Sequence, residues 1–235
     1  IDGTLIANNL EIEATQYRTV EFEFQANNMI LTNSYIEAST KYTYEYDSNN
    51  VDSDIIFDTN ALTIYNSTVI VDSQQTGTYE HSYQRKGYSD LVIESNDLEI
   101  YNGSIIVQAL NNGEHTGDYQ KSFTNLEIDV DNFTVTHSTI QSKLKTSRGD
   151  EVLSINSLNF LQRNSTIMAV DMSIEVGSIS SNGTLKIIDS EYIPFGNSRD
   201  YNYTKNFDFT VYSNSDIIFD NVTFFFHGRA ETTYY

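Results

Sequence analysis

Residues 62–69, Leu-Thr-Ile-Tyr-Asn-Ser-Thr-Val, decide the fold of this chain. The same phrase returns at residues 98–105, Leu-Glu-Ile-Tyr-Asn-Gly-Ser-Ile, and with His in place of Asn at residues 133–140. Apolar and polar residues alternate on both sides of the polar step, which predicts two short strands. The Asn-Ser or Asn-Gly step predicts a turn, because Asn and Gly tolerate left-handed backbone angles. Each copy therefore predicts a strand, a corner and a second strand.

Looser copies extend this phrase along the chain. The predicted corners are at Asn33, Asn66, Asn102, His137, Asn164, Asp189 and Asn221, which are 25 to 36 residues apart. A repeat of this length indicates stacked units rather than one globular core. Abundant β-branched and aromatic residues, with a single proline, disfavour helical repeats.

We therefore predict an all-β, single-domain parallel β-helix (solenoid) of about 7–8 coils with variable polar loops. It would span residues 1–235, either as a whole domain or as a segment of a longer solenoid. The rival is an immunoglobulin-like sandwich, whose strands would not be expected to repeat one phrase so often.

The repeated phrase resembles that of the right-handed parallel β-helix proteins of the pectin-lyase-like group, from about Leu5 to about Phe226. The resemblance implies a tight corner that carries a column of stacked Asn side chains. The matching residues are Asn33, Asn66, Asn102, Asn164 and Asn221, whereas His137 and Asp189 depart from the pattern. Because this fold hosts lyases, hydrolases, adhesins and inert rods, the resemblance predicts architecture and leaves activity open.

Stacked amides can hydrogen-bond to the coils above and below them, since each has donors and an acceptor. We expect the corner amides to form such a ladder and to point inward. A second column is expected through Asn28, Asn60, Asn96, Asn132, Asn156 and Asn214.

The composition excludes several function classes. A formal net charge of −20, from 33 acidic and 13 basic residues, would repel nucleic acid and anionic membranes. No apolar run is long enough for a membrane span, and the absence of cysteine excludes disulfides and thiolate zinc sites. Such acidity suits a soluble extracellular or cell-surface protein, a divalent-cation binder or a high-salt setting.

A weak calcium site is predicted near residues 47–54, where oxygen-bearing side chains gather. The candidate ligands are Asp47, Asn49, Asp52 and Asp54. The spacing fails the EF-hand pattern because Val51 occupies a ligand position, so a solvated acidic turn is the alternative. Calcium is the one cofactor that this sequence suggests.

Tyrosine-rich loops are the predicted interaction surface, formed by Tyr42, Tyr44, Tyr46, Tyr79, Tyr119, Tyr201 and Tyr203. Exposed rings could stack on glycans or pack against a neighbouring subunit. The alternative is that they shield the sheet of their own rod.

Seven Asn-x-Ser/Thr sequons occur, of which four fall at predicted corners. Because inward-pointing amides cannot carry sugar, Asn66 and Asn102 are expected to be unmodified. The glycosylation candidates are Asn202, Asn182 and Asn132.

No catalytic residue is predicted. The resemblance implies either clustered Asp residues with a His, or an Arg or Lys base beside acidic calcium ligands, and neither set is recognisable here. Carboxylates from neighbouring coils could still converge in space. An ice-binding surface would need a regular Thr-x-Thr face, and the Thr residues do not repeat in register along the sequence.

The expected function is therefore that of a non-enzymatic extracellular structural protein, a subunit or segment of a fibre, sheath or adhesive stalk. It would form a homo-oligomer or filament through its solenoid ends and Tyr-rich loops. The alternative is a carbohydrate-binding or polysaccharide-degrading β-helix protein.

Overall fold

The computed structural model describes residues 3–16, 18–43, 50–77, 85–113, 120–144, 149–169, 171–188, 209–213, 217–220 and 223–227. The helices and strands described in these ranges comprise β-strands only, and all of the strands join one 15-stranded sheet. Within the same ranges no helix is long and apolar enough to cross a membrane.

The strands follow one another in successive turns of the chain. Their bounds are β1 (Thr4–Asn8), β2 (Glu11–Gln16), β3 (Thr19–Thr32), β4 (Tyr35–Thr43), β5 (Val51–Tyr65), β6 (Thr68–Gly77), β7 (Arg85–Tyr101), β8 (Ser104–Gly113), β9 (Gln120–Thr136), β10 (Thr139–Leu144), β11 (Gly149–Ala169), β12 (Asp171–Ile188), β13 (Phe209–Ser213), β14 (Ile217–Phe219) and β15 (Thr223–His227).

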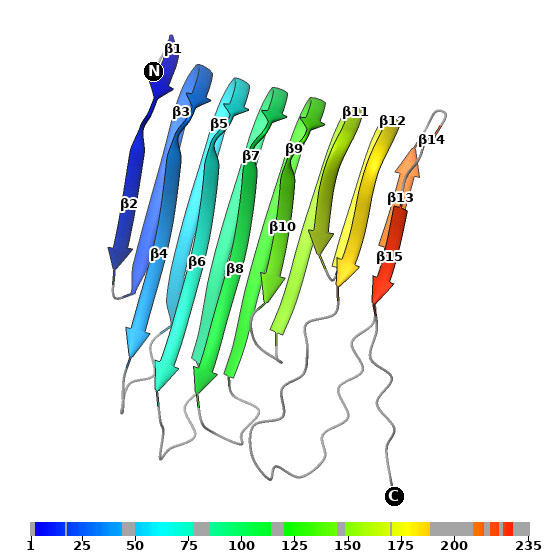
Figure 1. The fold of residues 1–235 in the computed structure, drawn as a ribbon. Helices are drawn as coiled ribbons and strands as arrows, with labels where there is room; N and C mark the ends of the chain where they lie inside the picture. The colour runs from blue at the N-terminus through cyan, green and yellow to red at the C-terminus, as the bar shows by residue number, and fades with distance from the viewer. Residues whose placement is uncertain are drawn as a thin grey trace, which may run out of the picture.

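The order of the strands in the sheet shows a solenoid. The strands before each corner pair in the order β1-β3-β5-β7-β9-β11, and those after it in the order β2-β4-β6-β8-β10-β11 (Figure 1). Strand β12 then forms a further turn, on which β13, β14 and β15 stack. The described strands thus make eight turns, and each turn pairs in parallel with the next.

These pairings confirm the predicted all-β parallel solenoid. The immunoglobulin-like alternative is excluded because its sheets are antiparallel.

The core is a set of apolar rows that run through successive turns. One row aligns Phe24, Phe57, Ile93, Ile128 and Ile155 in register. The last four of these side chains are completely buried. Since each turn adds one residue to every row, the core grows with the number of turns rather than around one centre.

A polar layer closes each turn where its last strand approaches the first strand of the next. Ser89 Oγ donates to the Gln108 carbonyl at 2.7 Å and lies 2.9 Å from Ser73 Oγ on the preceding turn, so it links two consecutive turns. Thr40 and Ser53 form the equivalent contact one turn earlier, at 2.9 Å between their hydroxyl oxygens. These buried hydroxyls satisfy one another where the chain passes from one turn to the next.

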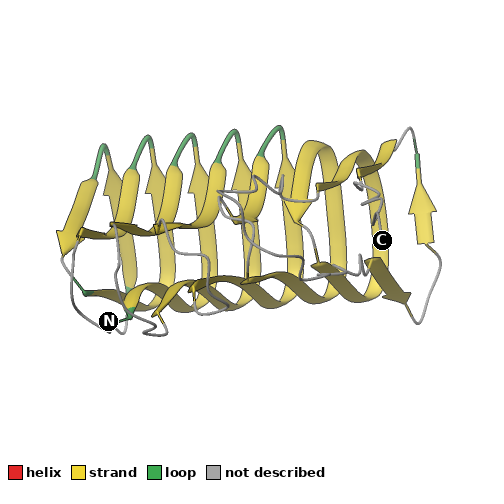
Figure 2. Cartoon of the chain, turned by 90° about the horizontal axis from the view of Figure 1, so that it is seen from below, coloured by secondary structure: helices red, strands yellow, loops and turns green. Residues whose placement is uncertain are grey.

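The corners adopt the left-handed backbone that the sequence predicts. Positive φ angles of 47° to 56° occur at Asn9, Asn33, Asn66, Asn102, His137 and Asn164. The corners lie in one line along an edge of the solenoid (Figure 2). Asn9 is a corner that the sequence repeat missed.

The corner amides form side-chain contacts but do not point inward, as the sequence led us to expect. Asn66 Nδ2 donates to Asn33 Oδ1 at 3.3 Å, and Asn164 Nδ2 lies 3.3 Å from His137 Nε2. All of these side chains are exposed, as is that of Asn102. The expectation was wrong because a left-handed residue at an outer corner directs its side chain away from the core.

Two further expectations about the corners and the polar columns are wrong. The corner that follows Asn164, which is the seventh when Asn9 is counted, is not at Asp189. Register places Asn182 opposite Arg163 and Thr184 opposite Thr166, so this corner lies between Asn182 and Thr184. The supposed second Asn column is not one row either. Asn28 aligns with Ala61 and Asp97, while Asn60 donates to Asn27 at 3.4 Å. Asn221 lies outside the described residues.

Hydroxyl residues do repeat in register, contrary to the sequence-based expectation. The row after the corner runs through Thr68, Ser104, Thr139, Thr166, Thr184 and Thr223. The next outward row holds Ile70, Ile106, Gln141 and Met168, so a Thr-x-Thr face does not form along these turns.

Replacement of the corner residue Asn66 tests the left-handed turn. Asn66→Val is expected to lower the free energy of unfolding by about 1–2 kcal/mol, because a β-branched residue is disfavoured at the φ of 48° found there. Asn66→Gly, the matched control, loses the amide contact but accepts the same backbone. Urea denaturation followed by circular dichroism measures both variants. Equal destabilisation by Val and Gly would show that the amide contact, rather than the backbone angle, is what matters.

Candidate functional site

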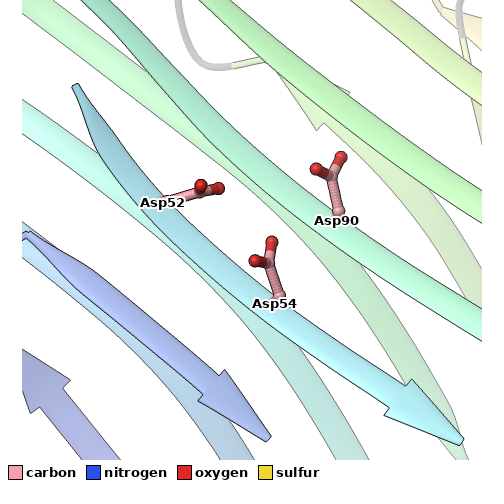
Figure 3. A group of neighbouring side chains, drawn as sticks. All are labelled: Asp52, Asp54 and Asp90. Carbon is pink, nitrogen blue, oxygen red and sulfur yellow. The ribbon is translucent and has the colours of Figure 1, made fainter. Parts of the chain in front are cut away.

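Three aspartates converge on the outer face of the solenoid. Asp52 and Asp54 lie on β5, and Asp90 lies on the neighbouring strand β7 (Figure 3). Each carboxylate offers an oxygen within 4.8 Å of the other two. Alternation along β5 places Ser53 and Ile55 in the core, so Asp52 and Asp54 both face outward.

Parallel register explains how this cluster forms. Asp54 pairs with Asp90 on one side and with Glu21 on the other. Three acidic residues therefore occupy adjacent places in one outward row, with Asp52 two residues away on β5. Like charges at this spacing repel each other, and partial burial of the Asp side chains weakens the screening by water.

The carboxyl groups are consequently poised to hold protons near neutral pH. Burial, together with the charges of Asp52, Asp90 and Glu21, raises the pKa of Asp54 to about 7. Burial and the charge of Asp52 raise the pKa of Asp90 to about 6. Burial also raises the pKa of Asp52, which is hydrogen-bonded to Asp54. In addition, Asp54 Oδ1 is a buried oxygen without a hydrogen-bond partner among the described residues.

Proton uptake and cation binding both relieve this repulsion. A carboxyl group with a pKa near neutrality can donate or accept a proton, as the acids and bases of glycoside hydrolysis do. Convergent carboxylate oxygens are also the ligands that Ca²⁺ prefers. The trio can therefore exchange protons or hold a hard cation, and calcium binding stays a prediction.

Removing one carboxylate should change how stability depends on pH. The folded chain keeps the Asp54 proton up to about pH 7, whereas an unfolded Asp loses it near the ordinary pKa of 3.8. Stability therefore falls as the pH rises through this window, because the folded state binds more protons there. Asp54→Asn should accordingly melt at a higher temperature than the wild type at pH 8, and the difference should disappear by about pH 4.

Asp58→Asn is the matched control, since Asp58 is exposed on the same strand. Thermal melts across this pH range would contradict the account if both variants behaved alike. The same melts with added calcium test the metal prediction. A bound ion should raise the melting temperature of the wild type and not that of Asp54→Asn.

The structure places only part of the predicted calcium site. Asp52 and Asp54 come together, whereas Asp47 and Asn49 lie outside the described residues. The sequence missed Asp90, although a signal was present. Asp90 follows Asp54 by 36 residues, the same interval that separates the corners Asn66 and Asn102.

The predicted tyrosine surface is wrong where it can be examined. Tyr42 is 1 % exposed, so its ring is buried rather than available to a partner. Its position six residues after buried Ile36 gives it the same inward direction on β4. The other predicted rings lie outside the described residues: Tyr44, Tyr46, Tyr79, Tyr119, Tyr201 and Tyr203.

A different tyrosine pair reaches solvent beside the corners. Tyr65 and Tyr101 are each 41 % exposed. Their rings stack with centroids 5.3 Å apart and an interplanar angle of 4°. His137 meets the ring of Tyr101 edge-on at 5.7 Å.

The glycosylation candidates are only partly placed. Asn132 is exposed on β9, and its Nδ2 donates to Asp97 Oδ1 at 2.7 Å. Asn182 is part of strand β12, and Asn202 lies outside the described residues. Because Asn66 and Asn102 are exposed, the inward orientation no longer argues against sugar at these two sequons.

Comparison with protein-family models, with curated proteins and with solved structures found no match for this chain.

Proposed function

We propose that this chain is a non-enzymatic structural protein, a subunit or segment of an extracellular or cell-surface fibre, sheath or adhesive stalk. It assembles through the ends of its solenoid. The parallel turns and the left-handed Asn corner also support, as part of this proposal, kinship with the right-handed pectin-lyase-like group.

The observation that carries the proposal is the incomplete burial of apolar side chains in the first described strands, β1 to β3. Residues of the inward rows there remain only partly buried: Leu5, Leu10, Ile12, Ala14, Phe22 and Phe24. Their partners in the next turns, such as Ile36 and Ile55, are completely buried. Exposed apolar surface that continues a core is stabilised when another turn covers it.

The charge of the chain favours contact at the ends. A formal net charge of −20 makes two rods repel each other side by side. The end of a rod presents open apolar rows and open strand edges, which bind through burial and backbone hydrogen bonds rather than through charge. End-to-end contacts that do not close into a ring generate filaments.

Light scattering coupled to size-exclusion chromatography tests this proposal. The purified chain should form oligomers whose mean mass rises with protein concentration, and moderate salt should strengthen them by screening the net charge. A monomer at all concentrations and salt levels would contradict the proposal.

Carbohydrate binding is the second candidate function, and the exposed Tyr65–Tyr101 pair favours it. Aromatic rings beside exposed amides suit the apolar faces and hydroxyl groups of sugars. A glycan array should then show binding that is lost in Tyr65→Ala. Unchanged binding in this variant would show that the Tyr65–Tyr101 pair is not the glycan-binding surface.

A further inference from the structure

The residue after a corner is tied to the next turn by its backbone amide. The Ser34 amide donates to Ser67 Oγ at 2.9 Å. The Gly103 amide donates to Ser138 Oγ at 3.1 Å, and the Ser138 amide donates to Ser165 Oγ, also at 3.1 Å. In these turns the amide is thus held by the serine hydroxyl that lies one turn further along the rod.

One step of this ladder is missing. The turn after Ser67 has Gly103 in the serine position, and glycine offers no hydroxyl. The register there is the usual one, since the Ser104 amide donates to the Ser67 carbonyl at 2.9 Å. No group within the described part of the chain accepts a hydrogen bond from the Ser67 amide. Ser67 is buried, and buried backbone donors are rarely left without a partner.

An unbonded amide at this position can act as a nucleophile. The backbone nitrogen of the residue after an Asn attacks the side-chain carbonyl carbon of that Asn. A C–N bond closes a five-membered succinimide ring, and the side-chain nitrogen leaves as ammonia with the proton that the backbone nitrogen gives up. Water then opens the ring at either carbonyl and leaves aspartate or isoaspartate. Because the attacking nitrogen must lose its proton, a hydrogen bond from that N–H opposes the reaction.

Asn33 and Asn66 form a matched pair for this chemistry. Each is exposed, each has a φ of 48°, and each is followed by a buried serine. They differ in one respect: the Ser34 amide is bonded to Ser67 Oγ, whereas the Ser67 amide has no acceptor among the described residues. The reaction is therefore favoured at Asn66 over Asn33.

Asn102 provides a second comparison. It is exposed, its φ is 52°, and the residue that follows it is glycine, which in an unfolded chain hinders the attack least. The fold opposes that order, because Ser138 Oγ holds the Gly103 amide. Asn164 is not a like case, since register at the next corner places Gly183 alone opposite two residues.

We propose that Asn66 is the site of spontaneous deamidation in the folded protein, and that the serine hydroxyl one turn further along protects Asn33 and Asn102. The proposal goes beyond the structural role, because it concerns the chemical lifetime of the rod. Each event removes the amide that donates from Asn66 Nδ2 to Asn33 Oδ1 and places a carboxylate in the line of corners. Isoaspartate also lengthens the backbone at the corner.

Peptide mass spectrometry of the aged protein tests the proposal. The folded chain, made in a host that adds no N-linked sugar, is kept at mildly alkaline pH and sampled over time. Asn66 is expected to convert about two- to tenfold faster than Asn33, the factor that corresponds to one ordinary hydrogen bond. Asn102 should convert more slowly than Asn66. In denaturant the order should change, with Asn102 fastest and with Asn33 and Asn66 close to each other.

Substitutions one turn away isolate the hydrogen bond. Gly103→Ser supplies an acceptor without changing the Asn66–Ser67 sequence, so it should slow the conversion of Asn66 to the rate of Asn33. Gly103→Ala is the matched control, because it adds the same Cβ, which would lie 3.0 Å from Ile100 Cγ2, without a hydroxyl. Asn66 should stay fast in this control.

Ser138→Ala tests the same kind of bond at another corner and does not depend on whether Gly103→Ser folds. It removes the acceptor of the Gly103 amide, so Asn102 should convert faster while Asn33 keeps its rate. Circular dichroism checks that each variant is folded. Equal rates for Asn33 and Asn66 in the folded wild type would overturn the proposal. Equal slowing by Gly103→Ser and Gly103→Ala, or an unchanged Asn102 in Ser138→Ala, would overturn it as well.

Discussion

Phe133→Ala is expected to lower the free energy of unfolding by about 3–5 kcal/mol. The Phe133 ring is 1 % exposed and stacks on Phe160 of the next turn, with centroids 4.9 Å apart and an interplanar angle of 16°. On its other side it is in register with Leu98. The substitution therefore opens a cavity in a row that links three turns, and neighbours fixed by the ladder can collapse into it only partly.

Leu158→Ala is the matched control for this truncation. Leu158 lies on the turn that follows Phe133 and is 60 % exposed, so loss of its side chain removes little buried surface. Urea denaturation should separate the two variants by several kcal/mol if the row of Phe133 is core. Equal, small losses would mean that Phe133 is not a core residue.

Ser138→Ala is expected to cost about 1–3 kcal/mol, although it deletes a single oxygen atom. Ser138 Oγ donates to the Thr136 carbonyl at 2.7 Å and accepts a hydrogen bond from the Gly103 amide at 3.1 Å. The Ser138 side chain is buried, so water cannot replace either bond. Loss of the hydroxyl therefore leaves a buried donor and weakens the contact between two turns.

Ser173→Ala provides the control, because Ser173 is exposed on β12. Thermal and urea unfolding should show a clear loss for Ser138→Ala and almost none for the control. A Ser138→Ala variant as stable as the wild type would contradict the assigned role of the buried serines at the corners.

Local pattern was enough to predict the strands and most of the corners. The alternation of apolar and polar residues on both sides of Asn66 and Asn102 depends only on neighbouring residues. Tolerance of left-handed backbone angles is a property of Asn itself. His137 was placed correctly for the same reason, since its position in the phrase fixes its backbone angle.

The role of the serines could not be predicted in the same way. The corner Asn was predicted to face the core, but which of the two corner residues does so depends on the path of the whole turn. The structure assigns the inward place to Ser34, Ser67, Ser138 and Ser165, which are buried and bond to backbone groups. Gly103 takes this place in one turn, where a side chain would meet Ile100 Cγ2 at 3.0 Å.

Turns of irregular length explain the remaining errors. β11 and β12 are separated by a single residue. The corner on β12 therefore lies earlier in the sequence than it would if a long loop connected the two turns. The carboxylate trio depends on register between turns, which is why Asp54 was found from local composition and Asp90 was not. The 36-residue interval between the corners Asn66 and Asn102 would have aligned Asp54 with Asp90.

Electron microscopy of the purified protein, over a range of concentrations, tests end-to-end assembly most directly. The account predicts straight rods whose lengths are multiples of about 38 Å, the height of eight turns at ~4.8 Å per turn. Rod length should increase with concentration, and width should stay constant. Single particles at every concentration, or clusters that grow in width rather than length, would contradict it.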